Sequence, residues 1–80
     1  MPGLLKRSLV LAGHRTSLAL EAEFWRALET MAAQRELSLA GLVAEIDIAR
    51  ATHAPDRLLA SACRVEALAW AQGPHHEGPT

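Results

Sequence analysis

The residues that could carry chemistry are few, and their spacing excludes most kinds of active site. Cys63 is the only cysteine, so the chain forms no internal disulfide bond. Glu45 and Asp47 lie two positions apart, about 200° around a helix axis, and so do not form a carboxylate pair. The histidines are not spaced like zinc ligands: His14, His53, His75 and His76. We see no nucleophile beside a base and no glycine-rich phosphate loop, and we expect neither an enzyme nor a bound metal or cofactor.

The chemistry that remains is ionic, and it is concentrated at one end of the chain. Lys6, Arg7 and Arg15 give residues 1–20 a charge of +3, because this stretch contains no Asp or Glu. The other sixty residues carry five Arg and nine acidic residues, a charge of −4, so the net charge is −1. Such segregation creates a local positive surface, which decides partners more than the total charge does.

The length and composition predict one small cytoplasmic domain. The chain has 80 residues, of which 50% are apolar. A core of this size supplies only about 3–5 kcal/mol, so we expect an obligate dimer. No apolar run approaches the length of a membrane span, and the apolar stretch 9–12 is too short for a secretory signal. A single free cysteine fits the reducing cytoplasm.

The elements that position the cations begin with a β segment over residues 4–20. Leu9 and Leu11 are odd-numbered, whereas Leu18 and Leu20 are even-numbered. The change of phase at Gly13 requires a bulge or a turn, so the segment is one kinked strand or two short strands. Isolated strands are not stable in water, and no other part of the chain resembles a strand. Pairing with the same segment of a second copy is the economical solution.

Two helices follow, joined by a tight corner. The first is predicted over 21–35 and the second begins after Ser38, a favourable N-cap. Their apolar stripes are Phe24, Leu28, Met31 and Ala32 in the first, and Leu39, Leu42, Val43 and Ile46 in the second. Glu36 stands where a helix end usually has Gly, at a cost of about 1 kcal/mol.

A third helix is predicted over 55–72, because Pro55 suits a first helical position and Gly73-Pro74 ends a helix. Its predicted stripe is Leu58, Ala62, Val65 and Ala69, widened by Leu59 and Leu68. The domain organisation is then a flexible N-terminus over 1–5, a folded domain over 6–72 and a disordered tail over 73–80.

This order of elements resembles that of the ribbon-helix-helix proteins. The stretch RTSLALEAEFWRAL (15–28), followed by LSL (37–39), is similar to that family. KRSLVLAGHRTS (6–17), with FW (24–25) and AEID (44–47), resembles a small bacterial subfamily of stand-alone domains; the resemblance covers roughly residues 6–70. It implies a mainly α fold with one N-terminal β segment, β-α-α plus a third helix. It also implies an intertwined homodimer of the Arc and MetJ kind, with an intermolecular antiparallel ribbon.

The resemblance further implies a DNA-binding transcription regulator, such as a repressor, whose ribbon enters the major groove. On this basis Arg15 contacts a guanine, Ser17 makes one hydrogen bond, and Ala19 offers apolar contact to a thymine methyl. From alternation alone, Arg15 could equally be a solvated strand residue. Ala19 is a weak reader where relatives carry a polar or charged residue.

The predicted phosphate contacts come from two places. The backbone amides of Leu39 and Ala40, behind the Ser38 cap, form a helix N-terminus that binds a phosphate in the family. Lys6 and Arg7 are predicted to contact phosphates from an arm, and His14 is placed with them. Alternatively, Lys6 and Arg7 belong to an arm that keeps the protein soluble and makes no specific contact.

Other functions remain open. Ribbon-helix-helix domains often serve as antitoxins, whose C-terminal extension binds a partner protein, and the helix over 55–72 could do this. Alternatively that helix covers the dimer core, or the dimer is a scaffold that does not bind DNA. Trp25 and Trp70 are predicted as packing residues and Cys63 as a buried structural thiol. Whether dimers pair further on DNA is left open, and no membrane partner is expected.

Overall fold

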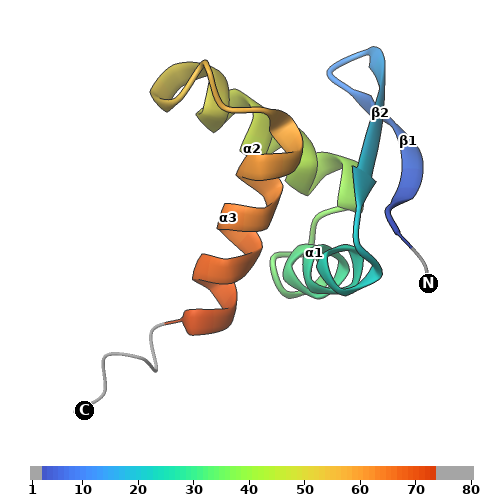
Figure 1. The fold of residues 1–80 in the computed structure, drawn as a ribbon, viewed down its shortest axis with the longest axis vertical. Helices are drawn as coiled ribbons and strands as arrows, with labels where there is room; N and C mark the ends of the chain where they lie inside the picture. The colour runs from blue at the N-terminus through green and yellow to red at the C-terminus, as the bar shows by residue number, and fades with distance from the viewer. Residues whose placement is uncertain (1–2, 74–80) are drawn as a thin grey trace.

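The computed structural model describes residues 3–73 of the chain, which form a β-hairpin followed by three helices (Figure 1). The elements are β1 (Leu5–Leu11), β2 (His14–Leu20), α1 (Ala22–Gln34), α2 (Leu39–His53) and α3 (Leu59–Gln72). The hairpin stands to one side of α1 and α2, and α3 packs back across both of these helices. Most of the tail predicted over 73–80 lies outside the described residues.

The predicted β segment is two strands that pair with each other. Ala12 and Gly13 have positive φ, 51° and 85°, as a two-residue type I′ turn requires. The turn sets Leu11 opposite His14, and the antiparallel register runs on to Leu5 opposite Leu20. Of the two alternatives, one kinked strand or two short strands, the second is observed. A pairing partner was expected in a second copy; within one chain, β1 and β2 pair with each other.

The register explains the change of phase at Gly13. Residues that lie opposite each other in an antiparallel pair share a face, so odd positions of β1 share a face with even positions of β2. This inner face carries Leu11, Leu18 and Leu20, which are buried against the helices. A two-residue turn therefore keeps the leucines of both strands on the same side.

The core is formed within one chain and draws on every element. Its fully buried large side chains come from β2 and all three helices: Leu20, Leu28, Leu42, Val43 and Cys63. On α1, Trp25 is 3% exposed, whereas Phe24, predicted on the core stripe, is only partly buried. Trp25 buries its large ring because its indole N–H finds an acceptor, the backbone carbonyl of Leu5, at 2.8 Å.

The corner between α1 and α2 has the geometry that the sequence indicates. Glu36 has a φ of +59°, the left-handed conformation in which Gly is most favourable. The amides of Glu36 and Leu37 donate to the carbonyls of Ala33 and Ala32, at 3.1 and 2.8 Å, which is a Schellman motif. The hydroxyl of Ser38 accepts from the amide of Gly41 at 2.9 Å and so caps α2.

The third helix begins at Leu59 rather than at Pro55. Residues 55–58 form a turn instead, in which the amide of Arg57 donates to the carbonyl of Ala54 at 2.9 Å. The guanidinium of Arg50 holds this turn by donating to the carbonyls of Pro55 and Arg57, at 3.4 and 2.9 Å. Pro55 suits a turn as well as a helix start, because its fixed φ is compatible with both.

The face of α3 that packs on the chain differs from the predicted stripe. Ala62 and Cys63 are buried as expected, but Ala67, which is not on the predicted stripe, is buried too, and Val65 is 43% exposed. Small side chains allow α3 to lie close to α1 and α2, which it contacts along its length. One alternative for this helix was that it covers the dimer core; in the structure it folds back over the core of its own chain.

Candidate functional site

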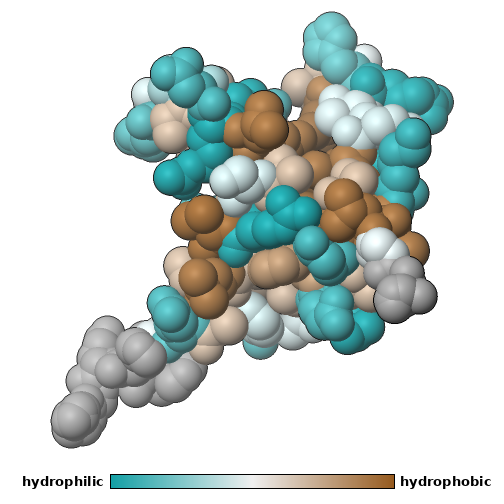
Figure 2. All heavy atoms as spheres, viewed as in Figure 1, coloured by the Kyte–Doolittle hydropathy of each residue, from teal (hydrophilic) through white to brown (hydrophobic). Residues whose placement is uncertain are grey.

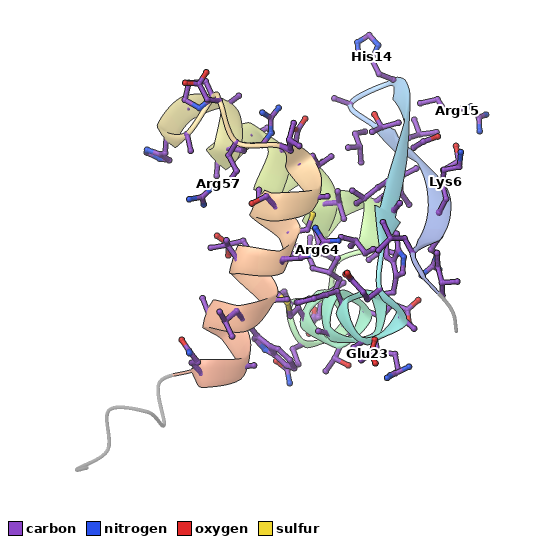
Figure 3. The ribbon with its side chains drawn as sticks, viewed as in Figure 1. Lys6, His14, Arg15, Glu23, Arg57 and Arg64 are labelled. Carbon is purple, nitrogen blue, oxygen red and sulfur yellow. The ribbon has the colours of Figure 1, made fainter. Side chains whose placement is uncertain are left out.

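The register of the hairpin defines a surface that faces away from the helices, which we call the outward ribbon face. It consists of three residues from each strand: Lys6, Ser8 and Val10 of β1, and Arg15, Ser17 and Ala19 of β2. All are exposed except Ala19, which is partly buried. In Figure 3 the Lys6 and Arg15 side chains extend away from the helices, on the side of the hairpin opposite α3.

The outward ribbon face is positive and polar. It contains two cations, two hydroxyls and no acidic residue. The guanidinium of Arg15 lies 3.3 Å from the hydroxyl of Ser8 on the neighbouring strand, so it is held lightly and remains exposed. Hydrophilic side chains follow this side of the hairpin in Figure 2, whereas hydrophobic side chains lie along α3.

Arg7 lies on the opposite face of β1, where its side chain contacts two residues of α1. Its guanidinium carbon lies 4.8 Å from the centre of the Trp25 ring, and its Nη1 is 2.9 Å from Glu29. Trp25 in turn donates to the carbonyl of Leu5. These contacts, the Arg7 cluster, fasten β1 to α1. The cation–π contact contributes about 0.5–1 kcal/mol at an exposed site, and the ion pair contributes less.

The other predicted phosphate residues fall into separate places. Lys6 belongs to β1 and to the outward ribbon face rather than to a flexible arm, and β1 already includes Leu5. His14 is at the tip of the hairpin, beside the turn (Figure 3), and its strand position is that of the inner face. Lys6 is thus grouped with Arg15 and Ser17, and His14 lies apart from them.

The start of α2 carries the third group of predicted residues. Ser38 caps the helix, and α2 packs against β1. The first amides of a helix have no partner inside the helix, and the Ser38 hydroxyl takes only that of Gly41. The amides of Leu39 and Ala40 are therefore free of intrahelical bonds and lie at the positive end of the helix dipole.

The outer edge of β2 is also unpaired in the two-stranded sheet of residues 3–73. Leu11 and His14 flank a two-residue turn and so form a hydrogen-bonded pair. Alternation along the ladder then directs the backbone groups of Arg15, Ser17 and Ala19 away from β1. This edge offers a full set of donors and acceptors to another strand.

Polar contacts elsewhere hold the helices together. Arg64 of α3 donates from Nε to the carboxylate of Glu21 at 2.9 Å, and its guanidinium lies 5.7 Å from the centre of the Phe24 ring. The hydrogen bond from Arg64 lowers the pKa of Glu21 below its ordinary value. Burial raises the pKa of the Cys63 thiol to about 11, so this cysteine is a neutral packing residue.

The hollows in the described part of the chain are small. A hollow of about 130 Å³ between α2 and α3 is lined by Ile46, Arg50 and Glu66 among others. Pockets for drug-sized molecules are usually larger, about 300–1,000 Å³. Within residues 3–73, no cluster of three potential metal ligands occurs. No helix of this region is long and apolar enough to cross a bilayer.

A two-stranded ribbon with a positive outer face, carried on helices that meet at a tight corner, is typical of β-ribbon proteins that bind nucleic acid. Comparison with protein families identifies one of them: the family model of the ribbon-helix-helix domain matches residues 4–71. The chain belongs to this family. Searches of curated proteins and of solved structures returned no significant match. Members of the family are typically DNA-binding transcription regulators and are generally not enzymes.

Two members of the outward ribbon face, Ser8 and Val10, were not predicted as site residues. The segment before and after Gly13 was predicted as one kinked strand or two short strands, and Lys6 and Arg7 were placed on an arm. The Ala12-Gly13 pair between two alternating apolar segments was the available signal for a hairpin. It is weak, because Ala at a position of positive φ is much less common than Asn or Asp.

Proposed function

We propose that this protein is a homodimeric transcription regulator that binds double-stranded DNA in a sequence-specific way, through the β2 strands of two chains. Membership of the ribbon-helix-helix family supports DNA binding and dimerisation. The observation that carries the proposal is the outward ribbon face, which has cations and hydroxyls but no carboxylate to repel phosphates.

Arg15 is the main reader of bases in this proposal. A guanidinium can make two hydrogen bonds to O6 and N7 of a guanine in the major groove, which is the commonest specific contact to DNA. Ser17 supplies one further donor or acceptor, and Ala19 contacts a thymine methyl. The Arg15 side chain is exposed, and within the described part of the chain its one hydrogen bond is the long contact to Ser8, so little is lost when it turns to a base.

Phosphate contacts come from Lys6, from His14 at the hairpin tip and from the start of α2. The amides of Leu39 and Ala40, behind the Ser38 cap, form a site of the kind that binds phosphate at helix N-termini. Arg7 is left out of this set, because its guanidinium already pairs with Glu29 and lies on Trp25. We assign it to positioning β1.

The dimer is proposed to form at the outer edge of β2. Two β2 strands that pair antiparallel across a twofold axis satisfy the exposed backbone groups of Arg15, Ser17 and Ala19 in both chains. The inner faces of the two hairpins then stay on their own helices. The arrangement places both sets of reading residues side by side.

The test is selection of bound fragments from sheared genomic DNA at near-physiological salt, where non-specific electrostatic binding is weak. Related, near-palindromic fragments should be enriched by the native protein. Arg15→Ala should lose about 1–3 kcal/mol on them and relax the base preference at one position of each half-site. Arg26→Ala, which removes an exposed arginine from α1, is the matched control. Equal enrichment with Arg15→Ala and with the native chain would remove Arg15 as the reader.

A second candidate function, an antitoxin-like or scaffold protein, is favoured by the outer side of α3. Leu58, Val65 and Leu68 are 75%, 43% and 56% exposed there and could contact a partner protein. Co-expression with the product of a neighbouring small gene tests this. A stable complex that Val65→Lys abolishes, while Arg15→Ala leaves it intact, would favour the partner role. Absence of any complex would favour DNA binding alone.

A further inference from the structure

We propose that β1 is a backbone-clamping strand: in the DNA complex it lies over the wall of the major groove, where Lys6 and Ser8 hold phosphates while β2 reads bases. This inference rests on the proposed function, because it requires two chains joined at the β2 edges. It assigns β1 to a part of the nucleic acid distinct from the bases that β2 reads.

The argument begins with the width of the sheet. Each chain brings two strands, so the dimer has four, in the order β1, β2, β2 of the partner, β1 of the partner. Neighbouring strands lie about 4.8 Å apart, so the axes of the outer strands are about 14 Å apart. The major groove of B-DNA is about 12 Å wide. A two-stranded ribbon fits within the groove, but the outer strands of a four-stranded sheet do not.

The register decides which side chains meet the groove wall. Lys6 lies opposite Ala19, and Ser8 lies opposite Ser17, so both share a face with the readers of β2. Lys6 is a point charge suited to phosphate, and Ser8 can donate from its hydroxyl. Neither has an acidic partner among residues 3–73, and both are exposed. These are the chemical groups that the sugar-phosphate backbone recognises.

The Arg7 cluster holds β1 in this position. Arg7 alternates with Lys6 and Ser8 along the strand, and it binds Glu29 and Trp25 of α1 from the opposite face. The Trp25 indole fixes the start of the strand through the carbonyl of Leu5. A strand anchored at its inner face presents its outer face in a fixed orientation, which a flexible arm does not.

The test compares the salt dependence of DNA binding for three forms of the full chain. Native protein, Lys6→Ala and Arg57→Ala are titrated with the selected fragment and with an unrelated duplex over a range of salt concentrations. Arg57 is the matched control, because it is an exposed cation far from the hairpin (Figure 3). Circular dichroism checks that the variants fold; the Lys6 side chain makes no hydrogen bond or ion pair with residues 3–73, so folding should not depend on it.

The expected result is that Lys6→Ala lowers the slope of log K against log salt by about 1.8, since two phosphate contacts are lost per dimer at about 0.9 each. Affinity should fall by the same factor on both duplexes, and Arg57→Ala should keep the native slope. Ser8→Ala should weaken both equally without changing the slope. Ethylation of the phosphates that Lys6 contacts should weaken binding of the native protein. Ethylation of the same phosphates should not affect binding of Lys6→Ala.

Three outcomes overturn the inference. A slope for Lys6→Ala equal to that of Arg57→Ala means that β1 does not reach the backbone. A changed base preference in Lys6→Ala means that β1 lies in the groove and reads bases. In both cases the native protein still selects its fragments, so sequence-specific binding through β2 stands and only the phosphate contact of Lys6 is removed from the proposed function. If the native chain binds neither duplex, the proposed function fails, and the role of β1 fails with it.

Discussion

Single residues carry backbone strain where this chain departs from the usual turn chemistry. Glu36 adopts a φ of +59° in the Schellman motif that ends α1, although a side chain is unfavourable there. The motif still forms, because two backbone hydrogen bonds and the capped start of α2 stabilise the corner.

The first prediction follows from this strain. Glu36→Gly should raise the free energy of unfolding by about 0.5–1 kcal/mol, because Gly adopts positive φ without a steric penalty. Urea unfolding measures the change. The matched control is Ala33→Gly, one turn earlier in the helix, which should lower stability by about 1 kcal/mol because its backbone is helical. A loss of stability in both variants would contradict the assigned conformation of Glu36.

The second prediction concerns the ion pair of Glu21 and Arg64. The pKa of Glu21 is lowered from 4.5 in the folded chain, chiefly by the hydrogen bond from Arg64. A carboxyl with a depressed folded pKa stabilises the fold above its unfolded pKa, and this contribution is lost as the pH falls through the folded value. Thermal unfolding of native protein and Glu21→Gln should therefore differ near neutral pH and converge in acid. A constant difference at all pH values would argue against the pair.

At the scale of elements, the hairpin depends on its two-residue turn. Gly13 has a φ of 85°, and a side chain there is strained even though nothing lies within 4 Å of its Cβ position. Gly13→Ala should destabilise the chain by about 1 kcal/mol, whereas Ala12→Asn should stabilise it, because Asn-Gly is the preferred type I′ pair. Chemical denaturation of both variants checks the prediction. Opposite signs are expected, and equal effects would contradict a type I′ turn.

The sequence predicted the helices and strands better than it predicted which of them pair or pack together. The two central helices, the Ser38 cap and the strain at Glu36 follow from local preferences, which act over a few residues. The pairing of β1 with β2 was missed, because Ala12 is an unusual turn residue and a strand pattern does not name its partner.

The errors in α3 have a related cause. Its buried residues are the small side chains Ala62, Cys63 and Ala67, which give a weak periodic signal, whereas the larger Val65 and Leu68 lie outside. Of the candidate site, the alternation of Arg15, Ser17 and Ala19 could be predicted from β2 alone. The contribution of β1 could not, since it depends on the register across the turn.

At the scale of the whole molecule, the chain has its own core, and the proposed dimer depends on one strand edge. Ser17→Pro removes an amide that faces outward from β2, so it should prevent dimerisation and leave the hairpin intact. Thr16→Pro, one residue earlier, removes an amide that faces β1 and should instead lower the stability of the chain. Sedimentation and circular dichroism distinguish the two. A Ser17→Pro protein that remains dimeric would place the interface elsewhere.

The turn at Ala12-Gly13 also has a kinetic consequence. When strands from two molecules must pair before a core exists, folding is second order and slows on dilution. Here β1 and β2 are neighbours in sequence, and Leu20, Leu28 and Cys63 meet within one chain. Closing so short a loop costs little entropy and takes microseconds or less. The chain should therefore refold at a rate independent of its concentration, and only the later association of folded copies should depend on how many are present.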